Sequence, residues 1–404
     1  MPDFSTNSPP LLLFYTYKKK KEGLPMEFSI NRNSFLEKLN TASRAIGAHS
    51  PVPALSGVLI QVREDHLVLT GSDSELVIQT TIVPDEKNQL VIASAGSIVV
   101  DSRLLLELIR KMSGETIQIF AADPDLMHLT GPDGNFELVG RSSESYPAVH
   151  LDRPEVHFQL PAKLLADIYN EIGYAVSEKN SRQVLMGINL QLSDRVLAAT
   201  ATDAYRLARK VSAVDTDESC KITIPASSFA EAVRSFGDEE TIDLYVNRKK
   251  VQFVFDHTVI QSTLFEGTYP DSRAIIPTQF VSTLVMNRSD LEGMLNRSAI
   301  YTISSSSSGN IVPIRMECTG EGVFIRVLTS DVGSCRQSFS DVEYMGSDIV
   351  VSYNAKLMLD ALKGLGNSKK VSLAFTGELR PIKITNPDDP TLTMIVVPLR
   401  AREG

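Results

Sequence analysis

One pattern of residues recurs about every 130 positions, and this period restricts the folds open to the chain. The interval from Gly57 to Asp73 reappears with the same length from Gly187 to Asp203, and a weaker third copy ends at Asp331. Each copy is about as long as an ordinary domain. A period of this kind indicates duplication of a whole folding unit. The sequence therefore predicts three similar domains in tandem.

Two helical patterns recur within each copy. The first has apolar residues at i, i+3 and i+4 and begins near Phe35, Leu164 and Leu291. The second is predicted over residues 101–112, 225–236 and 354–365. Asp101 and Asn354 are suited to cap their helices, and Pro225 to a first helical turn. Glycines at 114, 237 and 366 are placed to end them.

Short alternating segments between the helices, such as Val251–Phe255, are typical of half-buried antiparallel strands. We therefore predict an α+β protein in which each domain has two helices and antiparallel sheets. The expected domains are residues 26–152, 153–278 and 279–404. Residues 1–25 are predicted to lie outside them, either as a disordered extension or as a stretch that precedes a natural start at Met26.

Composition excludes several classes of protein. With 43% hydrophobic and 22% charged residues, the chain can bury substantial cores. A net charge of −9 excludes a basic surface over the whole molecule, so any role with nucleic acid must be local or topological. Three cysteines make neither a disulfide framework nor a zinc cluster, which indicates a cytoplasmic protein. No apolar run approaches the ~20 residues needed to cross a membrane.

Catalytic and cofactor motifs are missing from the sequence. The six histidines show no HExxH spacing, and there is no GxSxG elbow. Residues 364–370 faintly resemble a phosphate loop, but they follow a predicted helix and are more typical of its C-terminal cap. The repeated Asp73, Asp203 and Asp331 are either catalytic carboxylates or, as we favour, turn residues that accept backbone hydrogen bonds. We expect no metal, no cofactor and no catalytic residue.

Two segments point to a known family. Ala201-Thr-Asp-Ala-Tyr-Arg-Leu207 follows the second repeat motif, and Val396-Val-Pro-Leu-Arg400 lies near the end of the chain. With the threefold repeat, they resemble the bacterial sliding clamps, the β subunits of replicative DNA polymerase III. The resemblance extends from Met26 to Gly404. It implies a non-catalytic processivity factor that forms a head-to-tail homodimeric ring of six domains around double-stranded DNA.

The dimensions of such a ring can be checked from helix packing. Twelve helices spaced ~8–10 Å apart around a circle enclose a hole of roughly 22–28 Å once one helix width is subtracted. A B-form duplex, roughly 20 Å across, passes through it. Six helices from a single chain leave only about 6–9 Å by the same estimate. Dimerisation is therefore a requirement of this interpretation.

The predicted helices carry 11 basic and 9 acidic residues, so the acidity of the chain lies elsewhere. Basic residues on them can meet phosphates loosely without reading bases, or they form ordinary solvated helix faces. The resemblance adds contacts from a loop of the first domain and a loop of the second. The DNA-binding candidates are Lys38, Arg44, His49, Arg103, Arg110, Lys111, Lys179, Arg182, Arg234 and Arg297.

The resemblance also implies a groove between the second and third domains. It would take short Gln-x-x-Leu-Phe-like peptides from the polymerase III α subunit, the clamp loader, and other polymerases and repair proteins, by burying apolar anchors and pairing with exposed backbone. The matching residues are Leu185, Thr202, Tyr205, Arg206, Leu207, Pro270, Ile275, Asn354, Leu357, Leu379, Ile382, Ile395, Val396, Val397, Pro398, Leu399 and Arg400. The alternative for residues 396–399 is a terminal strand that completes a core.

For the ring interface, the matching residues are Phe136 in the first domain and Ile300 and Tyr301, expected after the first helix of the third. An internal core role for each is equally compatible with the sequence. A different class of function, an enzyme or ligand-binding protein with its site at a domain junction, also fits a triplicated chain. The absence of converging histidines, cysteines or nucleotide motifs counts against it.

Overall fold

The computed structural model describes residues 26–47, 52–123, 125–305, 313–329 and 333–400. The predictions for residues 1–25, His49 and Asp331 lie outside these ranges. The chain divides into two compact units, one that ends at Val149 and one that begins at His150. Each unit is described by itself below.

Strands and two helices build the first unit. Its elements are β1 (Met26–Asn31), α2 (Arg32–Ser43), η1 (Pro53–Ser56), β2 (Gly57–Val62), β3 (Leu67–Ser72), β4 (Leu76–Ile82), β5 (Val91–Ser94), β6 (Gly96–Asp101), α3 (Ser102–Lys111), β7 (Thr116–Asp123), β8 (Leu126–Gly131), β9 (Gly134–Arg141) and η2 (Ser143–Ser145). The strand order is β4-β3-β2-β6-β9-β8-β7-β1-β5, and each neighbouring pair is antiparallel.

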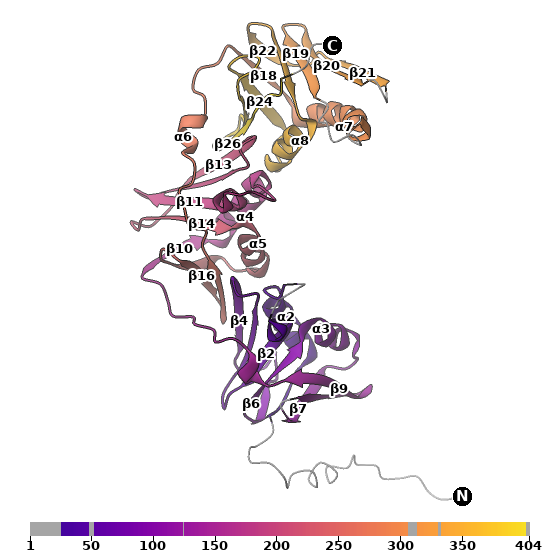
Figure 1. Ribbon diagram of the computed structural model, residues 1–404, viewed down its shortest axis with the longest axis vertical. Helices are drawn as coiled ribbons and strands as arrows, with labels where there is room; N and C mark the ends of the chain where they lie inside the picture. Colours follow the sequence, from indigo (N-terminus) through magenta and orange to yellow (C-terminus); the bar gives the residue numbers. More distant parts are fainter. Residues whose placement is uncertain (1–25, 48–51, 124, 306–312, 330–332, 401–404) are drawn as a thin grey trace, which may run out of the picture. The chain divides into compact units, whose positions relative to one another are not determined.

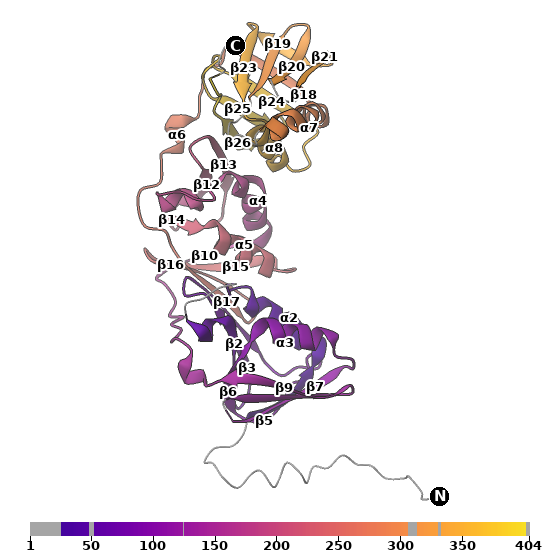
Figure 2. The same cartoon turned by 45° about the vertical axis from the view of Figure 1, so that its right-hand side comes forward.

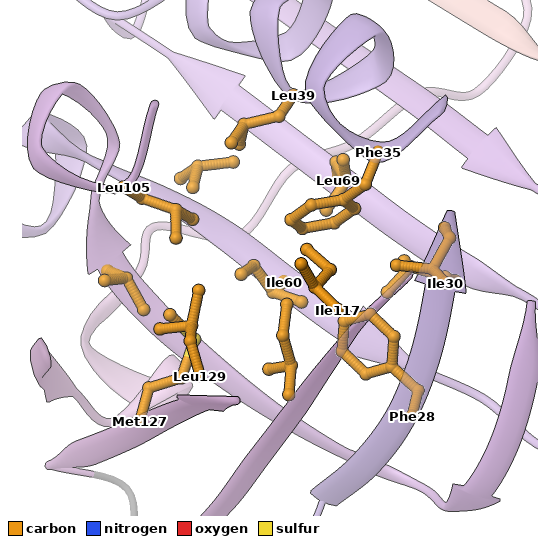
Figure 3. Close-up of a cluster of buried hydrophobic side chains, with 14 of the residues drawn as sticks. Phe28, Ile30, Phe35, Leu39, Ile60, Leu69, Leu105, Ile117, Met127 and Leu129 are labelled. Carbon is orange, nitrogen blue, oxygen red and sulfur yellow. The ribbon is translucent and has the colours of Figure 1, made fainter. Parts of the chain in front are cut away.

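The core of this unit lies between the sheet and its two helices, which pack side by side (Figure 1). Phe35 and Leu39 on α2 and Leu105 on α3 point toward strand residues such as Phe28 and Ile60 (Figure 3). All five are fully buried or nearly so. The i, i+4 spacing of Phe35 and Leu39 places both on one face of the helix, which explains why this face is covered by the sheet.

The second unit contains the other two copies of the repeat. The second copy comprises β10 (Val156–Pro161), α4 (Ala162–Ile172), η3 (Gly173–Ala175), η4 (Gln183–Met186), β11 (Gly187–Ser193), β12 (Val196–Thr202), β13 (Arg206–Ala213), β14 (Cys220–Pro225), α5 (Ala226–Ser235), β15 (Thr241–Val246), β16 (Lys250–Phe255) and β17 (Thr258–Thr263). A short helix, α6 (Ser272–Ile275), follows it.

The third copy comprises β18 (Ser282–Asn287), α7 (Arg288–Ser305), β19 (Ile314–Thr319), β20 (Gly322–Thr329), β21 (Gly333–Phe339), β22 (Glu343–Gly346), β23 (Ile349–Tyr353), α8 (Ala355–Gly364), β24 (Lys370–Phe375), β25 (Ile382–Asn386) and β26 (Asp389–Val396). Helices α4 and α5 pack together, and so do α7 and α8 (Figures 1 and 2).

All three copies share one topology, as the period of the sequence predicts. The opening strand of each copy pairs antiparallel with the strand that follows its second helix: β1 with β7, β10 with β15, and β18 with β24. The strand before each second helix pairs with the strand that opens the central hairpin: β6 with β2, β14 with β11, and β23 with β19. The prediction of an α+β fold with two helices and antiparallel sheets in each copy is confirmed.

One feature of the second unit was not predicted. A nine-stranded sheet runs β14-β11-β12-β13-β26-β25-β24-β18-β22, so strands of the second and third copies belong to one sheet. The remaining strands of the third copy form a four-stranded sheet, β21-β20-β19-β23. Shared backbone hydrogen bonds therefore make these two copies one compact unit.

The helix ends follow the predicted signals with one exception. Asp101 accepts a hydrogen bond from Leu104 N (2.8 Å), and Asn354 accepts one from Lys356 N (2.9 Å), so both act as N-caps. The glycines at 114, 237 and 366 all adopt positive φ, the conformation that favours glycine after a helix. Pro225 differs from its prediction, because it pairs with Gly187 at the end of β14 and stands one residue before the first turn of α5.

Candidate functional site

The seam between the second and third copies is formed by β13 and β26, which pair antiparallel from Arg206 opposite Val396 to Lys210 opposite Leu392. We call this pairing the β13–β26 seam. Beyond it, Val397 N donates to Tyr205 O (2.9 Å) and Leu399 N donates to Ser352 O (2.7 Å). The segment near the chain end is thus held by backbone hydrogen bonds to both copies.

The turn that leads into β13 is built by Asp203. Its Oδ1 accepts hydrogen bonds from Tyr205 N (2.8 Å) and Arg206 N (2.9 Å), and Ala204 between them adopts a φ of 77°. Asp73 builds the corresponding turn in the first copy by accepting from Glu75 N and Leu76 N. The prediction that the repeated aspartates accept backbone hydrogen bonds in turns is confirmed for these two.

Different side chains occupy the two turns. Where the first copy presents Glu75 to solvent, the second presents Tyr205, whose surface is 65% exposed. Large exposed apolar groups mark interaction surfaces when they gather. Tyr205 is therefore the first candidate contact for a partner at the seam.

Arg206 connects the turn to the third copy. Its Nε donates to Asp203 Oδ2 (3.0 Å) and its Nη1 donates to Asp360 Oδ2 on α8 (2.6 Å). All three side chains are largely buried. The guanidinium also lies 5.3 Å from the centre of the Tyr174 ring. Both carboxylates pair with the Arg206 guanidinium, so this group links β13 to α8.

A second ion pair lies farther along the seam. Lys210 Nζ on β13 donates to Glu171 Oε2 on α4 (2.5 Å) and lies 4.0 Å from Asp389 Oδ2 on β26. Burial raises the pKa of Glu171, although the hydrogen bond from Lys210 acts in the opposite direction. Two separate charged groups therefore link the second copy to the third.

Helix α8 also approaches the second copy closely. A Cβ atom on Gly364 would lie 2.6 Å from Glu171 O and 2.7 Å from Tyr174 Cε1. We expect Gly364→Ala to lower the free energy of unfolding by about 1–3 kcal/mol, as overpacking does elsewhere. Urea unfolding of the full chain measures it. Gly320→Ala is the control, because nothing lies within 4 Å of its added Cβ. Equal stability of the two variants would contradict this close approach.

The residues predicted to form the partner groove divide by exposure. The buried ones are Leu185, Thr202, Leu207, Ile382, Ile395 and Val396. The partly buried ones are Arg206, Pro270, Asn354, Leu357, Val397, Pro398 and Leu399. The exposed ones are Tyr205, Ile275 (42%), Leu379 (62%) and Arg400. The buried residues form the support beneath the predicted groove, and the exposed and partly buried residues form the surface that a partner would contact.

Several of these residues are brought together by contacts. Leu207 and Ile395 face each other across the seam, and Ile382 pairs with Val396 on the next strand. Thr202 Oγ1 donates to Arg206 O (2.6 Å), which closes the turn below Tyr205. Leu185 belongs to a small buried cluster with Val184 and Tyr269. Asn354 caps α8, the helix that carries Leu357 and Asp360.

The candidate DNA-binding residues lie mainly on exposed helix surfaces. Arg103, Arg110 and Lys111 lie on α3, Lys38 lies on α2 with Arg44 at its C-cap, Arg234 lies on α5, and Arg297 lies on α7. Lys38 is partly buried, whereas the others are exposed. Arg110 and Lys111 pair with Glu107, and Arg234 pairs with Glu231. Arg297 donates to Gln337 Oε1 (2.6 Å).

Lys179 and Arg182 lie on the loop between η3 and η4, and both are exposed. Within the described residues, neither side chain makes an ion pair. Asn180 Oδ1 accepts from Arg182 N (2.9 Å), which holds the loop backbone in a turn. These two cations are available to an anionic ligand.

The interface candidates are placed differently from expectation in one respect. Ile300 and Tyr301 lie within α7, which continues to Ser305, and not after it. The apolar spacing from Leu291 to Leu295 does not show this extension, because Ile300 is 62% exposed. Phe136 lies on β9 and is partly buried against the core of the first unit.

No set of three or more metal-ligating side chains gathers anywhere in the described ranges. Likewise, no helix in the part of the chain that the structure describes is long and apolar enough to span a membrane. Asp360 and Tyr174 are the seam residues that sequence reasoning missed. Their importance comes from contact with Arg206, which is 154 positions from Asp360 and leaves no local pattern.

Family comparison matches nearly all of the described chain, in three consecutive ranges. Residues 26–151 match the DNA polymerase III beta subunit, N-terminal domain, residues 159–271 match its central domain, and residues 273–400 match its C-terminal domain. The beta sliding clamp of Staphylococcus epidermidis is 30% identical over 379 residues, which cover 93% of this chain and 99% of the relative.

Solved structures of bacterial sliding clamps are similar to this chain as well. The DNA polymerase III beta chain of Streptococcus pneumoniae aligns with a TM-score of 0.88 and 29% identity, over 93% of this chain and 100% of that one. The DNA polymerase sliding clamp of Bacillus subtilis aligns with a TM-score of 0.87 and 26% identity, over 94% of this chain and 100% of that one.

Proposed function

Because the chain belongs to the DNA polymerase III beta subunit family, the bacterial sliding clamps, we propose that two copies close head to tail into a ring around duplex DNA. The ring holds the replicative polymerase on its template and has no catalytic activity of its own. The observation that carries this proposal is the recurrence of one topology in three copies, each matched by its own clamp domain. The proposed domain limits are 26–152, 153–278 and 279–404.

Two sheet edges support ring closure. Among the described strands, β9 pairs with β6 only through Gly140 and Arg141, so its stretch Gly134–Val139 has a strand neighbour on one side alone. β21 lies at the edge of the four-stranded sheet. Such edges are templates for pairing with another chain. We propose that β9 of one subunit lies beside β21 of the other, which gives a heterologous contact that closes after two subunits.

Exposed apolar side chains flank both edges. Val139 on β9 is 80% exposed, and Ile300 is 62% exposed on α7. Helix α7 packs against β21, and Gln337 on that strand donates to Met294 O (3.0 Å) and Ser298 Oγ (2.9 Å). Ile300 is therefore carried by the same helix that supports the edge strand. Burying such groups stabilises an interface core.

The β13–β26 seam is the proposed docking site for partner peptides. Exposed Tyr205, Ile275 and Leu379 supply apolar contacts, and the segment from Val397 to Arg400 supplies backbone for an extended peptide. The partners are the polymerase III α subunit, the clamp loader, and other polymerases and repair proteins with Gln-x-x-Leu-Phe-like motifs.

Contacts with DNA are proposed to be few and independent of sequence. Lys179 and Arg182 are the leading candidates because both are exposed and neither has an ion pair in the described ranges. The basic residues of the helices add to them where their acidic neighbours allow it. Loose phosphate contacts hold position without specifying bases, which permits sliding.

Loading onto circular DNA tests the ring. With a clamp loader and ATP, we expect the protein to stay on a nicked circle through gel filtration and to be lost once the circle is cut, because a threaded ring slides off an end. The control is a circle that carries the same nick and is left uncut. Equal retention on circular and cut DNA would show ordinary binding and contradict the proposal.

A further inference from the structure

A polar hollow of about 250 Å³ lies on the second copy, on the face of strands β14, β11, β12 and β13. Its wall is the loop at residues 268–273, which leads from the second copy to the third. The lining residues used below are Asn189, Thr200, Arg209, Lys221, Asp271 and Arg273. None of these six belongs to the proposed peptide site, the ring interface or the DNA-contact set, although Pro270 of the peptide site also lines the hollow.

Strand register shows why these side chains share one face. Asn189 pairs with Thr223 on one side and with Thr200 on the other, and Thr200 pairs with Arg209. The four residues form one row across the sheet, and directly opposed side chains stand on the same side. Lys221 starts the adjacent row, two residues from Thr223 on the same strand. The floor is therefore a polar row that ends in Arg209, with Lys221 in the adjacent row near its other end.

Positive charge predominates in the hollow. Arg209, Lys221 and Arg273 line it against the single carboxylate of Asp271, in a chain whose net charge is −9. The Asp271 carboxylate already accepts a hydrogen bond from Arg273 N (3.0 Å). Within the described ranges, the side chains of the three cations make no hydrogen bond or ion pair with the protein. Arg206, in contrast, has two carboxylate partners.

The charge of Arg209 is influenced by burial and by both charged residues of the loop. Burial lowers the pKa of its guanidinium, and the nearby positive charge of Arg273 lowers it further, whereas Asp271 acts in the opposite direction. An anion that lies near both guanidinium groups would offset the repulsion between them. Guanidinium groups bind phosphate oxygens through paired N–H donors, and a lysine adds a point charge.

We propose that this hollow binds a small polyphosphate anion, with Arg209 and Arg273 as its principal contacts and Lys221 and the Thr200 hydroxyl as additional donors. The hollow suits a compact group such as pyrophosphate or the phosphate chain of a nucleotide. Recognition rests on the phosphates, which both sources share. The ligand touches the sheet of the second copy and the loop that leads to the third.

Isothermal titration of the full-length protein with inorganic pyrophosphate tests the proposal. We expect saturable binding that weakens about tenfold or more in Arg273→Ala, because a charge-assisted hydrogen bond is lost. Arg209→Gln, which removes the charge and keeps a polar side chain, should weaken it similarly. The matched control is Arg248→Ala, which removes one exposed cation from a turn of the same copy and should leave the affinity unchanged.

Two further titrations, one with dATP and one with a glutamate-rich peptide, identify the source of the anion. Binding of dATP as tight as that of pyrophosphate supports a nucleotide-borne phosphate chain, and tighter binding of pyrophosphate supports the free anion. No heat with millimolar pyrophosphate would overturn the proposal, as would equal weakening by Arg248→Ala. A glutamate-rich peptide that binds more tightly than pyrophosphate, and depends on Arg273, would assign the hollow to an acidic protein segment instead.

Discussion

Arg206→Ala is expected to lower the free energy of unfolding by about 2–4 kcal/mol, because it leaves two largely buried carboxylates without their cation. Asp203 and Asp360 belong to different copies, so the seam loses a link as well as a charge. We also expect the affinity for a fluorescent Gln-x-x-Leu-Phe peptide to fall about tenfold or more, since Tyr205 and the terminal segment lie beside this link. Urea unfolding and a peptide titration measure the two effects.

A matched control removes an arginine from an exposed ion pair. Arg234 pairs with Glu231 on the surface of α5, and Arg234→Ala should change stability by less than about 1 kcal/mol. Asp360→Asn separates direct from indirect action of Arg206. If it weakens peptide binding as much as Arg206→Ala does, Arg206 positions the site, and if it does not, Arg206 contacts the peptide. Unchanged stability and affinity in Arg206→Ala would contradict the assignment.

The second large effect is expected at the ring interface. A charged group at Ile300 would be buried without a partner if α7 lies in the contact, which costs several kcal/mol. We expect Ile300→Asp to weaken dimerisation about 100-fold or more and to abolish retention on circular DNA. Analytical ultracentrifugation and the loading assay measure both.

Val196→Asp is the control for replacing an exposed apolar residue by aspartate. Val196 is an exposed valine at the start of β12, outside both proposed edges. It should leave dimerisation and retention intact. Peptide binding should also survive in Ile300→Asp, because the seam is formed within one chain. An Ile300→Asp protein that sediments as the wild type would place the interface elsewhere.

The sequence predicted the parts of the fold that depend on local pattern. Apolar periodicity predicts the helices, and Asp101 and Asn354 mark where two of them start. The spacing that repeats from copy to copy predicts their shared topology. Pro225 was misplaced by one residue, because a proline can end a strand as readily as it can begin a helix. The length of α7 was missed because its last turns carry exposed apolar residues.

Contacts between distant segments could not be predicted in the same way. The pairing of Arg206 with Val396 joins residues 190 positions apart, and nothing in either strand specifies the other. Asp360 has no motif around it, and its role is set by the helix that carries it. The turn at Asp203 was predicted, but its ion pair with Arg206 required the structure. The assignments of individual residues to DNA, peptide and interface remain predictions.

The β13–β26 seam has a consequence for how the chain is made. A ribosome releases β13 long before β26, so the second copy must wait for almost the entire remaining chain before its sheet acquires that neighbour. During this interval β13 offers an open edge to any nascent strand nearby. Contacts of such large sequence separation slow folding and prolong exposure to misassembly. The second unit can therefore complete its nine-stranded sheet, and cover the edge of β13, only after β26 has been synthesised.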